Sequence, residues 1–215
     1  MDKCPIPSAE PCDALGHGTH VLSTAIGGFG IGVAPAAKWI ACRSIALGWS
    51  RDEDALACLN FMLAPHARDG SQPRPWQRPH VIGNSYGWPS WREVTGAGID
   101  LAVKRLEAAG TVMVFAAGNS GPTCGTIHSA FSFTVGATDA ASRLALFSSR
   151  GPWYERRGVP GRQYLIKPEL VAPGHEILGA YGSGHAAKMS GTSMAAPLVA
   201  GSISLIRKCF CEGFL

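Results

Sequence analysis

The sequence predicts an α/β fold built on a mostly parallel sheet with helices on both faces. Segments with strand character alternate along the chain with segments of helical periodicity. The strand segments are near-continuous apolar runs, which is typical of parallel strands covered on both faces. Many of these segments end at glycine or proline, which terminate regular structure.

The elements follow in order from the first glycine-rich stretch. A helix is predicted from Gly18 to Ile26, because Gly27-Gly28 would end it, and Asp52-Glu53-Asp54 place acids at the start of a helix that continues to Leu63. The proline-rich residues 65–79 are predicted as a surface loop, and Ile99–Ala109 as an amphipathic helix closed by Gly110. Apolar runs predict strands at Lys38–Ile45, Val81–Ser85, Thr111–Ala116, Phe131–Ala137 and Leu170–Ala172. A last helix, rich in small residues, begins at Ser193, and Pro197 is expected within its first turn.

Size and composition indicate one globular domain. The chain has 215 residues, of which 46% are hydrophobic and 16% are charged, and it carries a net charge of +4. The excess basic residues gather between Arg150 and Lys167 in a Gly/Pro-rich segment without aromatic residues in a binding pattern, so we interpret them as a solvated loop and expect no nucleic-acid partner. Oligomeric state remains open.

Cysteine usage leaves the redox compartment open. The seven cysteines include no CxxC pair and no zinc spacing, and their odd number leaves at least one free thiol. Cys4 and Cys12 are close enough in sequence to form a disulfide. His17 and His20 lack a third ligand at suitable spacing, so no metal and no cofactor is expected.

No targeting or membrane segment is predicted in this sequence. The first residues, Met-Asp-Lys-Cys-Pro-Ile-Pro, contain no apolar signal core. The longest helical apolar run, Met194–Ile206, has 13 residues and is too short to span a bilayer. No membrane partner is therefore expected.

Polar residues follow two of the predicted strands, where ligands bind in parallel α/β sheets. These are Asn84-Ser85-Tyr86-Gly87 and Gly118-Asn119-Ser120-Gly121. Ser193 at a helix N-terminus suits a nucleophile whose attack creates an oxyanion, because backbone N–H groups and the helix dipole favour negative charge there. The alternatives are a capping serine at position 193 and a turn asparagine at position 119.

Histidine 17 is a candidate base for such a serine. It lies in Gly16-His17-Gly18-Thr19-His20, although a histidine between glycines is also a common loop residue. Other schemes fit worse, because the order of Ser193 and His17 and the Gly191-Thr192-Ser193-Met194-Ala195 pattern differ from an α/β-hydrolase elbow. Neither a P-loop nor a dinucleotide fingerprint is found.

Three motifs resemble the signatures of the subtilisin-like serine proteases (subtilases): GHGTHV at His17, AAGNSGP at Asn119 and GTSMAAPLVAG at Ser193. They occur in the family's order, and the resemblance extends from about Gly16 to Ile206. The stretch from Leu63 to Trp88 is most similar to the bacillopeptidase F-like branch.

The resemblance implies a three-layer subtilisin-like fold and a role for each matching residue. Ser193 would be the nucleophile, His17 the general base and Asn119 the oxyanion donor. The resemblance also implies that the substrate is a polypeptide and that the protein is secreted. The substrate-binding residues would be Ser85, Tyr86 and Gly87, which pair with the substrate backbone, and Ala116, Ala117 and Gly118 at the S1 pocket.

The sequence differs from the family pattern at the acid of the catalytic triad. Residues 1–16 contain Asp2 and Asp13 but no apolar strand, and Asp13 resembles the family's loop residue before the histidine motif rather than its triad acid. We therefore expect residues 1–215 to be a partial catalytic domain without the strand that carries the triad aspartate. Two hypotheses follow, an active serine endopeptidase or an inactive fragment that at most binds peptides.

Overall fold

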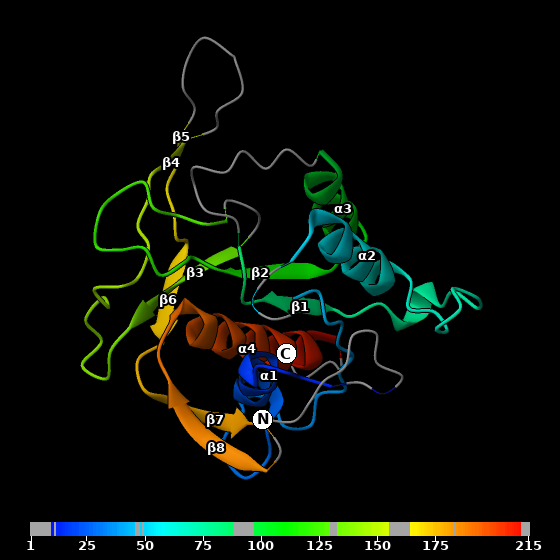
Figure 1. The fold of residues 1–215 in the computed structure, drawn as a ribbon, viewed down its shortest axis with the longest axis horizontal. Helices are drawn as coiled ribbons and strands as arrows, with labels where there is room; N and C mark the ends of the chain where they lie inside the picture. The colour runs from blue at the N-terminus through cyan, green and yellow to red at the C-terminus, as the bar shows by residue number, and fades with distance from the viewer. Residues whose placement is uncertain are drawn as a thin grey trace.

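A computed structural model describes residues 10, 12–45, 48, 50–87, 97–129, 133–154, 164–182 and 184–211. Its centre is a four-stranded parallel sheet with the strand order β1-β2-β3-β6 (Figure 1). The strands are β1 (Val81–Asn84), β2 (Val112–Ala116), β3 (Phe133–Thr138) and β6 (Leu170–Pro173).

Helices cover both faces of this sheet and produce three layers (Figure 1). On one face lie α2 (Asp52–Leu63) and α3 (Ala97–Ala108), and on the other lies α4 (Thr192–Cys211), with α1 (His17–Ile26) packed against it. The arrangement confirms the predicted α/β class. None of the helices within the described ranges is long and apolar enough to cross a membrane.

Strand β2 shows how the apolar sequence makes two cores. Its side chains alternate between the faces, so Met113 and Phe115 join the core under α2 and α3, whereas Val114 and Ala116 join the core under α4. The α4 side of that second core contains three buried alanines at 195, 196 and 200. These small side chains let the helix approach the sheet closely.

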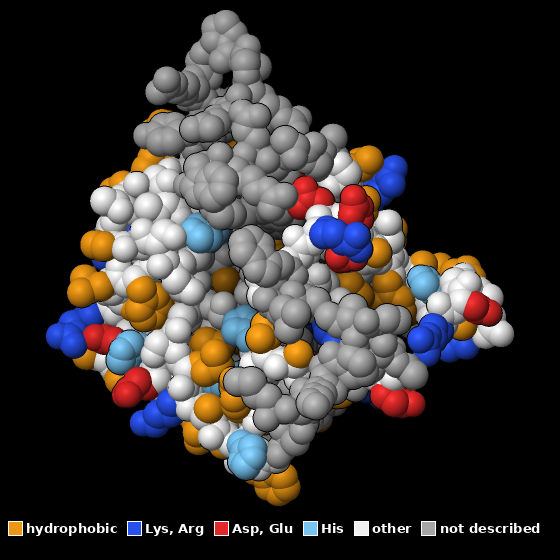
Figure 2. Space-filling model, in the orientation of Figure 1, with side chains coloured by type: hydrophobic (Ala, Val, Ile, Leu, Met, Phe, Trp, Pro, Cys, Tyr) orange, Lys and Arg blue, Asp and Glu red, His pale blue; other side chains and the backbone are white. Residues whose placement is uncertain are grey.

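The remaining elements lie outside the main sheet. A hairpin of β7 (Ile177–Tyr181) and β8 (His185–Met189) packs its first strand against α1. Two short strands, β4 (Trp153–Tyr154) and β5 (Tyr164–Leu165), pair with each other, and η1 (Pro75–Gln77) is a short turn of 3₁₀ helix within the predicted proline-rich loop. Charged side chains of both signs are interspersed toward the rim of the face drawn in Figure 2.

The strand predicted at Lys38–Ile45 is wrong. These residues form no strand, and Trp39 and Ile40 are 59% and 38% exposed. The apolar run suggested a buried strand, but a strand also needs a partner, and β1 pairs only with β2 in the described sheet. A disulfide between Cys42 and Cys58 ties this segment to α2 instead. The other predicted helices and strands are found within two residues of their expected ends, with two exceptions. Helix α4 continues to Cys211, five residues past the apolar run that ends at Ile206, and Phe131 and Ser132 lie outside the described residues.

Candidate active site

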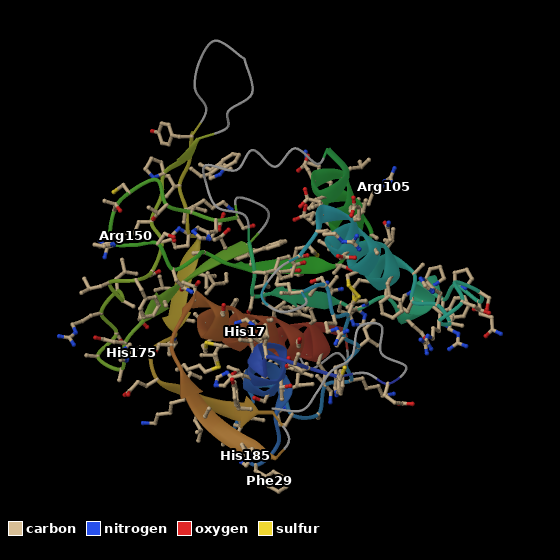
Figure 3. The ribbon with its side chains drawn as sticks, viewed as in Figure 1. His17, Phe29, Arg105, Arg150, His175 and His185 are labelled. Atoms are coloured by element: carbon tan, nitrogen blue, oxygen red, sulfur yellow. A yellow bond between two sulfur atoms is a disulfide. The ribbon has the colours of Figure 1, made fainter. Side chains whose placement is uncertain are left out.

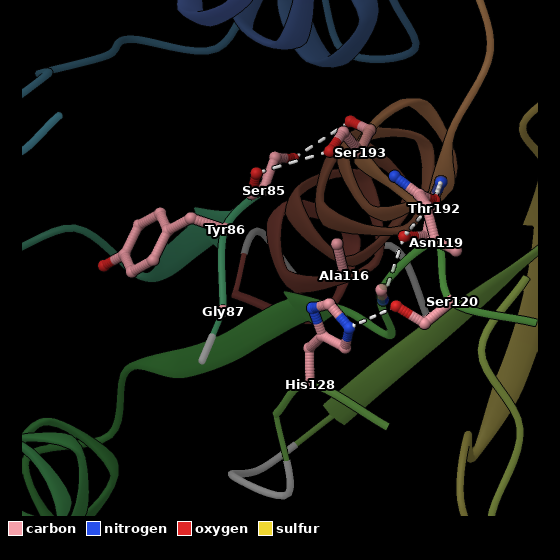
Figure 4. A pocket seen from close by; sticks show the side chains of 10 residues that line it. Ser85, Tyr86, Gly87, Ala116, Asn119, Ser120, His128, Thr192 and Ser193 are labelled. Atoms are coloured by element: carbon pink, nitrogen blue, oxygen red, sulfur yellow. Dashed lines mark hydrogen bonds between the residues drawn. The ribbon is translucent and has the colours of Figure 1, made fainter. Parts of the chain in front are cut away.

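A pocket of about 200 Å³ lies at the carboxyl ends of β1 and β2, beside the start of α4 (Figure 4). This is the edge of the sheet at which the sequence predicted a site. The residues that line it are Ser85, Tyr86, Gly87, Ala116, Gly118, Asn119, Ser120, His128, Thr192 and Ser193.

Ser193 is the second residue of α4 and is fixed to the end of β1 by two hydrogen bonds (Figure 4). Its Oγ donates to the Ser85 carbonyl at 3.3 Å, and the Ser85 hydroxyl donates to the Ser193 carbonyl at 2.9 Å. The first of these bonds is long for an O–H···O bond, so the Ser193 hydroxyl is held weakly. It does not cap the helix, which excludes the capping interpretation of this serine.

Pro197 explains the second bond. The structure places it inside α4 rather than in the first turn, so the helix lacks the N–H that would bond to the Ser193 carbonyl four residues earlier. The Ser85 hydroxyl supplies that missing donor. The proline therefore frees a carbonyl through which the strand end and the helix start are joined.

Asn119 lies beside Ser193 with its side-chain amide oriented by Thr192. The backbone N–H and the hydroxyl of Thr192 both donate to Asn119 Oδ1, at 2.9 and 3.1 Å, and the Gly118 N–H donates to the Thr192 hydroxyl at 3.1 Å. Two donors at one atom identify it as the carbonyl oxygen of the amide. Within the described ranges the two Nδ2 hydrogens have no acceptor, so they are available to an oxygen bound next to Ser193.

His17 opens α1, which packs against α4 (Figure 3). Burial lowers the pKa of its imidazole, the nearby Asp13 carboxylate raises it in part, and His20 lowers it further. The net shift is downward, which favours the neutral ring that can accept a proton. His17 does not line the pocket, and its ring forms no hydrogen bond to Ser193 among the described residues.

Asp13 organises the backbone before His17. One carboxylate oxygen accepts hydrogen bonds from the N–H groups of Leu15 and Gly16, and the other accepts bonds from the N–H and hydroxyl of Thr19. Burial raises the pKa of this carboxyl, but the bonds from Thr19, Leu15 and Gly16 outweigh burial and lower it. These bonds agree with a loop residue that shapes the helix start. Asp2 lies outside the described residues.

Replacing Asp13 by alanine is expected to lower the free energy of unfolding by about 2 kcal/mol, because four hydrogen-bond donors lose their acceptor. This value is at the upper end of the range measured when a helix-capping side chain is removed. Urea unfolding followed by circular dichroism measures this. Asp69→Ala is the matched control, since Asp69 accepts a backbone bond from Ser71 in an exposed loop, and it should change stability by less than about 0.5 kcal/mol. Equal effects of the two substitutions would contradict the role of Asp13 in holding the start of α1.

His20 has a structural position rather than an open one. Its ring is fully buried, and Nε2 lies 3.0 and 3.1 Å from the carbonyls of Ile177 and Ala187. It therefore joins α1 to both strands of the β7–β8 hairpin.

The predicted substrate-binding residues divide into two sets. Ser85, Tyr86, Gly87, Ala116 and Gly118 line the pocket, whereas Ala117 is fully buried behind it, with its carbonyl accepting the His128 N–H at 2.9 Å. The Tyr86 hydroxyl donates to Asn84 Oδ1 at 2.9 Å, and burial raises the pKa of this phenol to about 12. Tyr86 is therefore neutral and helps to form the pocket wall.

Sequence reasoning assigned no specific role to three residues of the pocket. Thr192 precedes the proposed nucleophile directly, so its position in the motif was the available signal. Ser120 follows Asn119 in the predicted polar turn, but a serine in a glycine-rich turn does not by itself indicate a functional role. His128 lies between β2 and β3 in no recognised motif, and only the fold brings it to the pocket.

The sequence is similar to a known family and to characterised members of it. The model of the subtilase family (Peptidase_S8) matches residues 5–211. Bacillopeptidase F of Bacillus subtilis is 34% identical over 212 aligned positions, and the match covers 93% of this chain and 14% of that protein. Subtilisin Savinase of Lederbergia lenta is 31% identical over 212 residues, covering 94% of this chain and 66% of that protein. The chain thus spans less than two thirds of these relatives.

Solved structures give the same fold. The prenylagaramide maturation protease PagA superposes with a TM-score of 0.71 at 23% identity, covering 95% of this chain and 69% of that one. A mutant of the protease domain of PatA also has a TM-score of 0.71, at 25% identity, covering 92% of this chain and 66% of that one. With the family match across nearly the whole sequence, these similarities show that the chain belongs to the subtilase family and has a subtilisin-like α/β fold.

Proposed function

We propose that residues 1–215 form part of the catalytic domain of a serine endopeptidase that hydrolyses peptide bonds in polypeptides. The observation that carries the proposal is the oriented amide of Asn119 beside Ser193. Thr192 holds Asn119 Oδ1, which leaves Nδ2 as a donor at the pocket that Ser193 lines. Membership in the subtilase family supports the same activity.

The proposed reaction uses two steps. Ser193 Oγ attacks the carbonyl carbon of the substrate while its proton passes to the His17 imidazole. The resulting oxyanion accepts hydrogen bonds from Asn119 Nδ2 and from the Ser193 N–H, which is among the first four N–H groups of α4 and has no acceptor within the helix. The His17 imidazolium then protonates the departing amine, and water hydrolyses the acyl-enzyme by the same route.

The proposal also covers how the substrate binds and where the protein is located. Ser85, Tyr86 and Gly87 would pair with the substrate backbone as an added strand. No metal or cofactor has a part in this chemistry. Secretion is proposed from the family, and the Cys42–Cys58 disulfide agrees with an oxidising compartment.

A second candidate function is peptide binding with little turnover. Two observations favour it. The Asp13 carboxylate already accepts hydrogen bonds from the N–H groups of Gly16 and Thr19, and the Ser193 hydroxyl bonds to Ser85 rather than to His17. In the described part of the chain, no carboxylate is hydrogen-bonded to the His17 ring. A serine protease without the acid that orients its histidine loses about 10⁴-fold in turnover.

A fluorophosphonate probe tests the nucleophile. Intact mass and peptide mapping should find one adduct, on Ser193, and the Ser193→Ala chain should remain unlabelled. Ser120→Ala is the control, because it removes another hydroxyl from the same pocket and should keep the adduct. Undiminished labelling of Ser193→Ala would refute the proposal, whereas labelling without peptide turnover would favour the second candidate.

A further inference from the structure

The side chain of His128 forms one wall of the pocket (Figure 4). Two glycines make room for it. A Cβ at Gly118 would lie 2.6 Å from the imidazole ring, and a Cβ at Gly87 would lie 3.1 Å from the Cβ of His128. His128 thus occupies space that side chains at these two positions would otherwise fill.

The His128 ring is held on one side and open on the other. Its Nε2 is hydrogen-bonded to the Ser120 hydroxyl at 2.7 Å, and its backbone N–H donates to the Ala117 carbonyl. Nδ1 has no hydrogen-bond partner in the described ranges, and Figure 4 shows it turned away from Ser120. An atom bound in the pocket can therefore bond to Nδ1 without breaking the bond that positions the ring.

His128 is also the ionisable group that decides the charge of the pocket. The ten lining residues include no Asp, Glu, Lys or Arg, and the other titratable group among them, Tyr86, stays neutral because its pKa is raised to about 12. Burial alone lowers the pKa of His128, which favours a neutral ring in the pocket. A carboxylate entering it would favour the imidazolium, whereas a lysine or arginine side chain would find no counter-ion among these residues.

We propose that His128, held by Ser120, is a specificity-determining residue, and that the pocket takes the carboxylate side chain of glutamate or aspartate. The proposal rests on the proposed function, because the pocket is assigned to the P1 residue by its position beside Ser193 and Asn119. Nδ1–H of His128 would donate to the carboxylate in a charge-assisted hydrogen bond.

Peptidyl diphenyl phosphonates that differ only at P1 test this preference. In each, Ser193 Oγ displaces phenol from phosphorus, so the rate of adduct formation by mass spectrometry reports binding next to the nucleophile. With P1 glutamate, glutamine and leucine probes at pH 6.5, the glutamate probe should react about tenfold faster than the other two, as a charge-assisted hydrogen bond predicts.

Three variants assign the preference to the imidazole. His128→Ala should abolish the advantage of the glutamate probe, and His128→Gln, which keeps a hydrogen-bonding group without the charge, should abolish its advantage over glutamine. His175→Ala is the matched control, since that exposed ring stacks on Phe147 outside the pocket, and it should leave the ratio unchanged. Equal rates for the three probes, or an unchanged ratio in His128→Ala, would overturn the proposal.

A failure of the proposed function gives a different result. If neither these probes nor a simple fluorophosphonate modifies Ser193, the nucleophile assignment fails. The pocket is then tested by NMR titration of the Ser193→Ala chain with peptides ending in glutamate, glutamine or leucine. Tighter binding of the glutamate peptide that is lost with His128→Ala supports the preference, and equal binding rejects it.

Discussion

Replacing Asn119 by aspartate is expected to slow the phosphonylation of Ser193 by about 10²–10³-fold, the cost known for removing one oxyanion-hole donor from subtilisin. Aspartate keeps an oxygen that can accept the two bonds from Thr192, so the loop should hold its shape. The substitution removes both Nδ2 hydrogens and places negative charge where the oxyanion would form. The rate of adduct formation with a fluorophosphonate, relative to the unchanged chain, measures the effect.

Two substitutions at Thr192 provide the control. Thr192→Ser keeps the hydroxyl that bridges the Gly118 N–H and Asn119 Oδ1, and it should label at nearly the original rate. Thr192→Val removes that hydroxyl while keeping the backbone bond to Oδ1, so an intermediate loss of about tenfold is expected. If Asn119→Asp labels as fast as the unchanged chain, its amide has no part in stabilising the oxyanion.

Most of the sheet could be predicted from the sequence, because strands that are buried on both faces consist of apolar residues. Val112–Ala116 is apolar at every position, and the structure shows why, since Met113 and Phe115 face one core and Val114 and Ala116 the other. The same apolar pattern gave a wrong prediction at Lys38–Ile45. Apolar composition reports a tendency to be buried, whereas a strand depends on a neighbour that pairs with its backbone.

The pocket was predictable in part, for a related reason. Ser193 and Asn119 each lie at an end of a regular element, where the fold class itself predicts ligand binding. His128 and the Asn119–Thr192 bonds depend on contacts between segments far apart in the sequence, and no local pattern encodes them. The β7–β8 hairpin was missed similarly, because its strands are half-exposed and lack a clear alternation.

Gly118→Ala is expected to lower the free energy of unfolding by about 3 kcal/mol. Gly118 has a φ of 105°, a conformation that costs alanine about 1 kcal/mol. Its new Cβ would also lie 2.6 Å from the His128 ring and 2.8 Å from the Ser149 hydroxyl, and overpacking of this kind costs about 1–3 kcal/mol more. Urea unfolding measures the stability, and the rate of Ser193 phosphonylation should fall because the His128 ring must move.

Gly110→Ala separates the two causes. Gly110 has a φ of 87°, and a Cβ there would meet no atom within 4 Å. Both substitutions therefore lose the conformational freedom of glycine, but only Gly118→Ala adds a clash. Gly110→Ala should cost about 1 kcal/mol and leave labelling of Ser193 unchanged. Equal losses of stability would mean that the backbone conformation alone requires glycine at 118, and that the His128 wall can yield to a methyl group.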